Sequence, residues 1–515
     1  MRISSSSPSA QRAACGALAA LLSLMVCPQA HAFGGFWSAP GSAVEQSAQQ
    51  IIFVDNPDAT VTAIIRLRYA GPAQSFAWVI PVRGKPTVGV SSNAVFQRLA
   101  AATAPEYWLE RAVQGTCMEP EDPGTAPDGG APPDAGPSQP YAPGPIVVLE
   151  QGTVGPYDYA EVLVDAQRSD AAQVATEWLE LNGYAPTGLE SELLSPYLDD
   201  GFNLLAFKLR KDLDAGVIRP VVLTYESELP VIPIRPAAVA AQDDVGLQVW
   251  VFGPSQAVPA NYKSLVINDA LIDWLSAKAF PAGTLPAGGV GPSGPPVPRP
   301  SNYDALVSAA ADEAGGRGFV TELGGPASQY RDKVWSVLDQ EQVTAIFGQS
   351  YEDGFDVVVA AHAAYRAWDG WKDAVEGAVT LPEGVTFDEL DEDPERYRGV
   401  AQVDTDRFLE LLDQHVVEPV SDVAALFANA PYLTRLYTTM SADELTVDPS
   451  FDYNFDLAQV SNVHVAKQRI ECEPTLSERE APWRIELPQG GVVVGSGGDG
   501  WPVAAGTLPA NLKVV

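Results

Sequence analysis

Basic residues, cysteine and histidine are all scarce in this sequence of 515 residues. It has 31 Lys and Arg against 66 Asp and Glu, which gives a net charge of −35, and only 4 Cys and 4 His. A surface this acidic repels phosphate backbones and anionic lipid headgroups, so nucleic-acid binding and docking on an anionic membrane are disfavoured. The same charge favours cationic partners and divalent metal ions.

Long apolar runs are also absent, except for a short one near the start, so we expect no transmembrane segment in the mature chain. The start is typical of an export signal: an apolar core from Ala13 to Val26 is followed by the small residues Ala30 and Ala32 around His31. We therefore predict a signal peptide over residues 1–32 and a soluble periplasmic, cell-surface or extracellular protein. A lipoprotein signal ending at Cys27 is the less favoured alternative, because Val26 suits the preceding position poorly.

Removal of such a signal leaves two cysteines, Cys117 and Cys472. In an oxidising compartment, two remaining cysteines are expected to pair with each other rather than stay free. The bridge would close a loop over most of the chain, for which the chain-entropy model gives about 4–5 kcal/mol. Two unrelated buried thiols are the alternative.

Two stretches dense in Pro and Gly divide the chain and predict linkers, because they cannot bury enough apolar surface to order themselves. The predicted fold class is α+β, with a sandwich-like or mixed sheet near the N-terminus and mainly helical structure near the C-terminus. The predicted parts are a β-rich part (33–117), a linker (118–145), an α+β part packed with the first (146–280), a second linker (281–300), a mainly helical acidic region (301–488) and a loose tail (489–515).

Two neighbouring apolar segments favour a β-hairpin in the first part. "VTAIIRLRY", residues 61–69, alternates apolar and polar side chains, as a half-buried strand does. "FAWVIPV", residues 76–82, is apolar on both faces and predicts a strand deep in a sheet. The Gly71-Pro72 turn between them suits a hairpin.

Carboxylates offer the sharpest candidate for a metal site. Oxygen side chains at alternate positions of a tight loop can converge on calcium, which prefers several hard oxygen ligands. The candidate ligands are Asp448, Asp452, Asn454 and Asp456. Aromatic residues interleave with them, so a strand with alternating faces is the alternative. A second acidic run, residues 388–395, is more typical of a solvated loop. No other cofactor is predicted.

Catalytic motifs are not found in the sequence. There is no GxSxG nucleophile elbow, and the histidines of the mature chain, His362, His415 and His464, lack metal-binding spacing. Whether the protein is an enzyme is left open, and a non-enzymatic role is favoured. Tyr365, Trp368 and Trp371 lie at helical spacing, where they could form a sugar-stacking platform or, as we favour, the core face of a helix.

Several phrases together resemble one bacterial family. They are "SAQQIIFVDNPDATVTAIIRLRYAGPAQSFAWVIPV", "TEWLELNGY", "SNYDALVSAAADEAGGRGFVTE" and, further on, "YLTRLYTTMSADELTVDPSFDYNFDLAQVSNVH". On these phrases, which span most of Phe33 to His464, the chain resembles the secreted family called domain of unknown function 2330 (DUF2330). Many members start the mature chain with a CGGFFC-like motif, where this chain has Phe33 and Ser38.

The resemblance implies an exported envelope protein and assigns no catalytic residues, because the family has no established activity. We therefore predict an exported cell-envelope protein with a non-enzymatic binding or envelope-organising role and an envelope or extracellular partner whose identity is unknown. The alternative is a secreted hydrolase, directed at glycans, that uses two carboxylates.

Overall fold

The computed structural model describes most of the chain downstream of the predicted export signal. The described residues are 35–37, 46–67, 77–117, 147–165, 168–183, 190–210, 218–227, 229–239, 241–284, 298–335, 337–351, 354–368 and 370–514. The predicted signal peptide, the predicted linker 118–145 and residues 285–297 of the second linker lie outside them.

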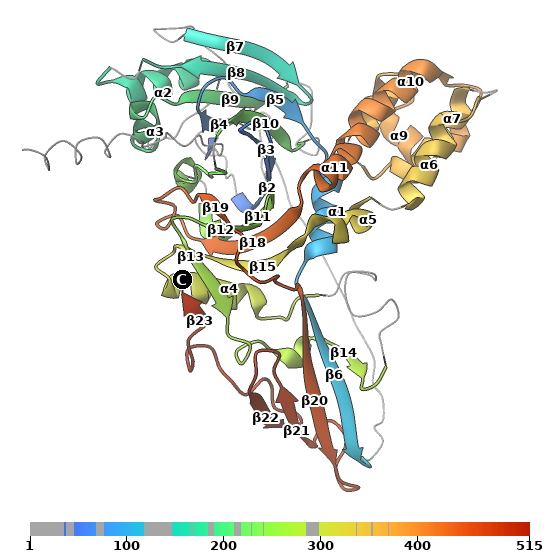
Figure 1. Cartoon of the computed structure of the whole chain (residues 1–515). Helices are drawn as coiled ribbons and strands as arrows, with labels where there is room; N and C mark the ends of the chain where they lie inside the picture. Colours follow the sequence, from blue (N-terminus) through green and yellow to red (C-terminus); the bar gives the residue numbers. More distant parts are fainter. Residues whose placement is uncertain are drawn as a thin grey trace, which may run out of the picture.

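The largest element is a nine-stranded mixed sheet whose strands come from both halves of the chain (Figure 1). Its strands are, from edge to edge, β23 (Asn511–Val514), β13 (Lys263–Ile267), β15 (Gly318–Pro326), β18 (Tyr432–Met440), β11 (Ala241–Gly253), β2 (Gln46–Asp55), β3 (Thr60–Leu67), β10 (Val221–Glu226) and β5 (Thr87–Val90). β11 pairs with β18 in antiparallel register, so this pair is the seam between the two halves. The mixed α+β class predicted from the sequence is confirmed.

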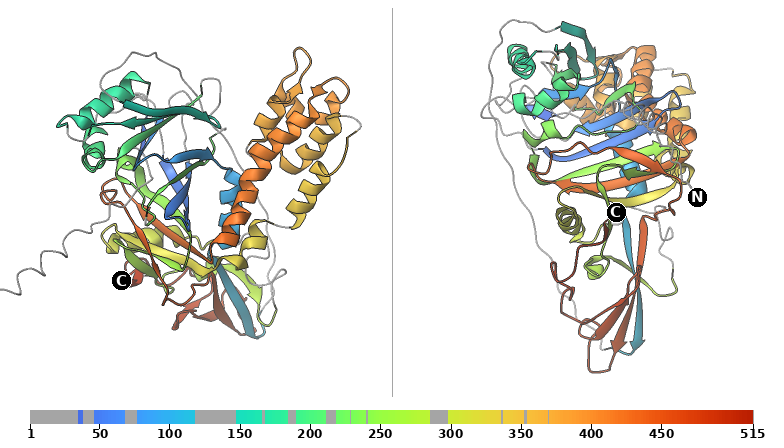
Figure 2. Two further views of the ribbon diagram at one scale, coloured as in Figure 1. Left: turned by 45° about the horizontal axis from the view of Figure 1, so that its top comes forward. Right: turned by 60° about the vertical axis from the view of Figure 1, so that its left-hand side comes forward.

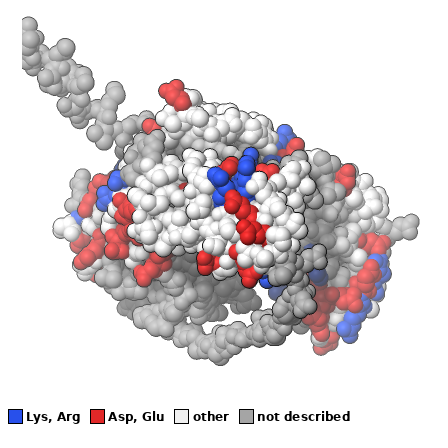
Figure 3. All heavy atoms as spheres, turned by 90° about the horizontal axis from the view of Figure 1, so that it is seen from below, with Lys and Arg blue, Asp and Glu red and all other residues white. Residues whose placement is uncertain are grey.

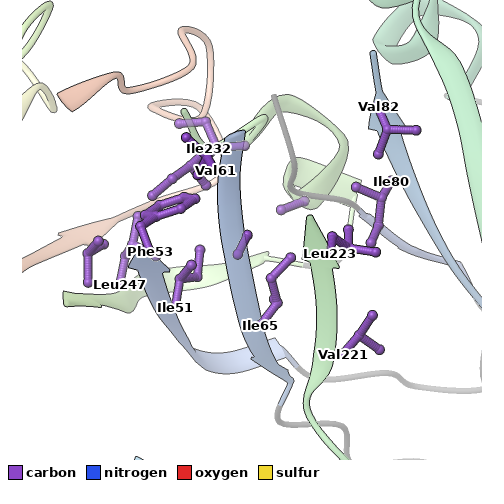
Figure 4. Close-up of a cluster of buried hydrophobic side chains, with 14 of the residues drawn as sticks. Ile51, Phe53, Val61, Ile65, Ile80, Val82, Val221, Leu223, Ile232 and Leu247 are labelled. Carbon is purple, nitrogen blue, oxygen red and sulfur yellow. The ribbon is translucent and has the colours of Figure 1, made fainter. Parts of the chain in front are cut away.

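A second sheet, the upper sheet, faces this one and makes a sandwich. It consists of β1 (Gly35–Trp37), β4 (Ala77–Val82), β9 (Asn203–Leu209), β8 (Tyr157–Leu163) and β7 (Val147–Val154). Ile80 and Val82 of β4 point toward Leu223 of β10 across the shared core (Figure 4). The apolar run from Ile51 to Val54 is buried on both faces, because helices cover the other side of the nine-stranded sheet.

Helices cover both outer faces of the sandwich. Outside the upper sheet lie α2 (Ala171–Leu181) and α3 (Glu190–Asp199), which bury Trp178 and Leu194 against it. Outside the nine-stranded sheet lie α1 (Asn93–Thr103), α4 (Tyr303–Glu313), α5 (Arg331–Val334) and α11 (Glu418–Asn429). In the part of the chain that the structure describes, no helix combines the length and apolarity needed to span a membrane.

A third sheet, the lower sheet, extends from the opposite side of the molecule (Figure 1). Its strands are β14 (Lys278–Pro281), β6 (Glu106–Gly115), β20 (Val463–Cys472), β21 (Pro482–Glu486) and β22 (Val492–Ser496). β6 and β20 run parallel over their whole length, and just beyond β6 a disulfide joins Cys117 to Cys472. This is the cysteine pairing expected from the sequence.

A helical unit, residues 337–429, stands beside the sandwich (Figure 2). It contains α6 (Val337–Phe347), α7 (Gly354–Tyr365), α8 (Trp371–Glu376), β16 (Val379–Thr380), α9 (Phe387–Glu392), β17 (Gln402–Val403), α10 (Thr405–Leu412), a π-helical turn (Asp413–Val417) and α11. The unit has its own apolar core, which includes Phe355, Phe408 and Leu412. α11 leads back to the nine-stranded sheet.

The prediction of mainly helical structure over residues 301–488 fits α4, α5 and this unit, but not the strands on either side of the unit. β15 precedes the unit, and β18 to β21 follow it. β18 becomes a central strand because β11 and β15 pair with its two edges. These partners are distant in the sequence, so a local sequence pattern does not predict the pairing. The predicted loose tail, 489–515, likewise contributes two strands, β22 and β23, to the edges of two sheets.

The predicted hairpin is also wrong. β3 pairs with β2 and β10 in the nine-stranded sheet, whereas β4 pairs with β1 and β9 in the upper sheet. The two segments therefore face each other across the core instead of pairing. β4 is buried along its whole length, as predicted. Pro81 fits there because β1 pairs with β4 only as far as Val79, so beyond that point β4 has a neighbour on one side only among the residues that the structure describes.

A buried ion pair clamps β15 to β18 beside the seam of the nine-stranded sheet. Arg435 of β18 donates to the Glu322 carboxylate at 2.6 Å, and their side chains are 6% and 0% exposed. Glu322 is the extra residue of a bulge in β15, which turns its side chain toward Arg435. Further hydrogen bonds run from Arg435 to Gln248 of β11 and Thr103 of α1, and from Tyr303 of α4 to Glu322.

We expect Arg435→Met to destabilise the protein by about 3–5 kcal/mol, because it leaves the buried Glu322 carboxylate without its cationic partner. Adding Glu322→Gln should recover a large part of that loss, since the uncompensated charge is then removed. Urea unfolding measures both changes. The matched control is Arg407→Met, which breaks an exposed ion pair with Glu410 and should cost at most about 1 kcal/mol. If Arg435→Met and Arg407→Met lowered the free energy of unfolding equally, the proposed importance of the buried ion pair would be contradicted.

Candidate functional site

A cavity of about 360 Å³ lies where the helical unit meets the sandwich. The helical unit provides most of its wall, from α7, α8, α9 and the turns that flank them. The sandwich provides Arg219, just before β10. The lining residues are Arg219, Val358, His362, Arg366, Ala367, Trp368, Gly370, Trp371, Lys372, Asp373, Val375, Phe387, Asp388, Leu390, Asp391 and Pro394.

Arg219 is buried and held in place from the sandwich side. Its backbone N–H donates to the Tyr157 hydroxyl at 3.0 Å, and that hydroxyl donates to the Arg219 carbonyl at 2.6 Å. Its Nε donates to the Ser91 carbonyl at 3.1 Å. The guanidinium then reaches the helical unit, where it lies 3.9 Å from the Asp373 carboxylate. Arg219 thus joins the two parts of the molecule at the cavity wall.

The guanidinium of Arg219 donates to a carbonyl of the helical unit that lacks its usual α-helical hydrogen bond. Arg219 donates to the His415 carbonyl at 3.0 Å, within the π-helical turn. Four residues further on, Pro419 has no N–H, so the usual α-helical hydrogen bond to that carbonyl cannot form. Gly370 approaches the same carbonyl so closely that a Cβ there would lie 2.3 Å from its oxygen. Burial lowers the pKa of His415, and the charge of Arg219 adds to this effect.

Asp391 forms hydrogen bonds with two ring side chains of the cavity wall, Trp371 and His362. Its carboxylate accepts a hydrogen bond from Trp371 Nε1 at 2.8 Å, and its carbonyl lies 2.8 Å from His362 Nε2. α9, which carries Asp391, begins with a capping box in which Thr386 and Glu389 exchange hydrogen bonds. The acidic run at 388–395 is therefore a capped helix followed by a short 3-10 turn and not the predicted loop, although most of its acidic side chains are exposed to solvent, as predicted.

Lys372 and Arg219 at the cavity each lie close to carboxylates, whereas Arg366 is a further, exposed cation of the lining. Lys372 Nζ lies 3.4 Å from Asp388 and 3.8 Å from Glu376. Arg219 faces Asp373, as described above. The cavity thus combines apolar walls with both hydrogen-bond donors and acceptors, and its lining carries no large excess of either charge.

A second hollow, of about 630 Å³, lies over the loop before β15 and the loop after β18. Its lining is polar and contains no aromatic side chain: Asn261, Lys263, Ala314, Gly315, Arg317, Asp443, Glu444 and Thr446. Lys263 is engaged there with the Ala314 carbonyl at 3.1 Å. Because small-molecule sites are usually lined largely by apolar and aromatic groups, the cavity at Arg219 is the better candidate.

The four predicted calcium ligands have different surroundings. Asp448 is buried and accepts hydrogen bonds from Tyr197 at 2.8 Å and from the Ile234 N–H at 2.9 Å. Burial raises the pKa of Asp448 to about 6. Asp452, Asn454 and Asp456 lie in or just after β19 (Phe451–Asn454), and the Asn454 side chain accepts from the Asp456 N–H.

This arrangement fits the alternative of a strand with alternating faces. Among the described residues, no cluster of three or more His, Cys, Asp and Glu side chains is placed to hold a metal ion. Calcium binding by the four residues stays a prediction.

The aromatic residues at helical spacing lie in or against the core of the helical unit, and two of them also line the cavity. Tyr365 and Trp371 are buried in the core of the helical unit, as we favoured. Trp371 and Trp368 also line the cavity, and the Arg98 guanidinium lies 4.6 Å from the centre of the Trp368 ring. The role of Arg219 in the cavity wall was not predicted from the sequence. The available signal was a single cation within the apolar run "VIRPVVL".

These observations define a mixed α+β protein that is built on a two-sheet sandwich and carries a helical unit with a cavity at their junction. Residues 28–370 match a family described as an uncharacterized protein conserved in bacteria (DUF2330), and the chain belongs to that family. The phrase at 432–464 that we related to longer members lies beyond the matched range. No curated protein matches the sequence, and no solved structure matches the fold.

Two buried titratable groups outside the cavity, His464 and Asp269, should make the free energy of unfolding depend on pH in opposite directions. Burial beside Tyr107 lowers the pKa of His464 to about 4, from an ordinary value of 6.5. The unfolded chain therefore gains the proton first, and stability is lost as the pH falls from 6.5 toward 4. Burial raises the pKa of Asp269 to about 6, so its stabilising contribution is present at low pH and is lost as the pH rises through 6.

We expect His464→Phe to make the free energy of unfolding rise less steeply with pH between 4 and 6.5, by at most about 1.4 kcal/mol per pH unit. Asp269→Asn should make the same slope steeper, because it removes the opposing effect. Urea unfolding at several pH values measures both slopes. Curves that stay parallel to the wild-type curve would show that neither group is buried as described.

Proposed function

We propose that this chain is an exported cell-envelope protein that binds a small polar ligand in the cavity at Arg219, without catalysing a reaction. The observation that carries the proposal is the composition of that cavity. Two parts of the molecule build it, aromatic rings and paired charges line it, and its size lies within the range of about 300–1,000 Å³ that is usual for small-molecule sites.

Export is supported by the sequence pattern of residues 1–32 and by the pairing of Cys117 with Cys472, since disulfides persist in oxidising compartments. The strongly acidic composition suits a protein that stays apart from anionic surfaces. Acidic side chains on the underside of the molecule are spread over several clusters among uncharged surface (Figure 3).

Binding is favoured over the hydrolase alternative by the contacts of the carboxylates. A glycoside hydrolase needs two carboxyl groups that face each other across the scissile bond. In this cavity, Asp391 accepts from Trp371, Asp388 lies beside Lys372, and Asp373 faces Arg219. These contacts orient the side chains toward protein partners, which suits a site that holds a ligand.

The test is ligand retention. Mature protein, starting at Phe33, is incubated with a small-molecule extract of bacterial periplasm and medium or, separately, with a cytoplasmic extract. It is then passed through a desalting column, and the bound compounds are released and identified by mass spectrometry. We expect a compound to be retained from the first extract by wild type but not by Ala367→Trp, in which an indole at an exposed lining position fills the mouth of the cavity.

Trp501→Ala is the matched control, because Trp501 is a half-buried tryptophan of the lower sheet region, stacked on Trp483 and far from the cavity. It should retain the compound as wild type does. Retention of nothing by wild type, retention only from the cytoplasmic extract, or equal retention by wild type and Ala367→Trp would contradict the proposal.

A further inference from the structure

The charges of the cavity decide which class of ligand it suits. Lys372 is close to two carboxylates, and Arg219 faces Asp373 while it donates to the His415 carbonyl. An anionic ligand would have to compete with the carboxylates for these two cations, and beside the exposed Arg366 it would still face the lining carboxylates Asp388 and Asp391. A cationic ligand would likewise have to compete with Lys372 and Arg219 for the carboxylates. Pairs of this kind penalise either net charge, because breaking one leaves a group without its partner.

An uncharged ligand rich in hydroxyl groups avoids that penalty. Each hydroxyl both donates and accepts, so it can hydrogen-bond to a carboxylate and to a cation without separating them. Asp388 and Lys372 are well placed for such bridging, since both are exposed at the cavity and lie 3.4 Å apart.

The apolar wall fits the same class of ligand. Trp368, Trp371 and Phe387 contribute flat rings to the lining. Trp368 is only half-buried, and Asp391 holds the indole of Trp371 through its N–H. Sugar rings present C–H groups on one face and hydroxyl groups around their edge. They therefore match an aromatic surface bordered by polar side chains, and a cavity of about 360 Å³ suits a mono- or disaccharide.

We infer that the cavity binds an uncharged carbohydrate, a mono- or disaccharide unit, with the sugar ring against Trp368 and its hydroxyl groups on the Lys372–Asp388 pair. This inference rests on the proposed function and narrows its ligand to one chemical class. Binding requires no reaction at the sugar.

The test is calorimetric titration of the mature protein with a panel of neutral hexoses, pentoses, N-acetylhexosamines and their disaccharides at millimolar concentration. Glucosamine is the cationic probe, and galacturonate and its dimer are the anionic probes. We expect at least one neutral sugar to bind and to quench tryptophan fluorescence, with the charged probes at least tenfold weaker. Trp368→Ala should weaken that binding at least tenfold, and Ala367→Trp should abolish it.

Trp501→Ala should leave binding unchanged, and thermal melting checks that every variant is folded. Because Ala367 is exposed, its substitution keeps the test valid even where Trp368→Ala fails to fold. Binding of no neutral sugar, tighter binding of a charged probe, or unchanged binding by Ala367→Trp would overturn the inference. If a compound is still retained from the envelope extract and lost in Ala367→Trp, the proposed function stands while the carbohydrate inference fails. If nothing is retained and no neutral sugar binds, both fail.

Discussion

The Arg435–Glu322 pair is the contact on which the rest of this structure depends. It joins β15 to β18 beside the seam where β18 meets β11, and Arg435 also donates across that seam to Gln248 of β11. A buried ion pair adds little net stability, because desolvation offsets much of the attraction. The hydrogen bonds of these two charges connect β15, β18 and β11 of the sheet with α1 and α4, which cover it. The sandwich and its covering helices are thereby set relative to each other.

That arrangement also positions the cavity. α11 packs on the same face of the nine-stranded sheet as α1, and through it the helical unit is held beside β10. Arg219 then meets the His415 carbonyl, which Pro419 leaves without its usual helical donor. A substitution in the sheet and one in the helical unit can therefore affect the same site, although they lie far apart in the sequence.

The sequence pattern predicted those features of the fold that depend on residues close together in the chain or on overall composition. The buried strand at 77–82, the α+β class and the pairing of Cys117 with Cys472 follow from apolar runs, composition and the compartment expected from the export pattern. Which strands pair with each other could not be predicted from the local sequence pattern. β3 and β4 look like a hairpin because they are adjacent, yet each has a better partner far away in the sequence. Isolated cations in apolar runs, Arg219 and Arg435, were the overlooked signal, because a charge there needs a buried partner.

The central claim is that one cooperative sheet unites the two halves of the chain across the β11–β18 seam. Native-state hydrogen exchange of backbone amides tests it most directly, because it reports the free energy of opening for each strand. The account predicts that amides of β2 and β11 on one side and of β15 and β18 on the other exchange with the same, global free energy of unfolding. Exchange of β15 and β18 through a separate opening of clearly lower free energy would contradict it.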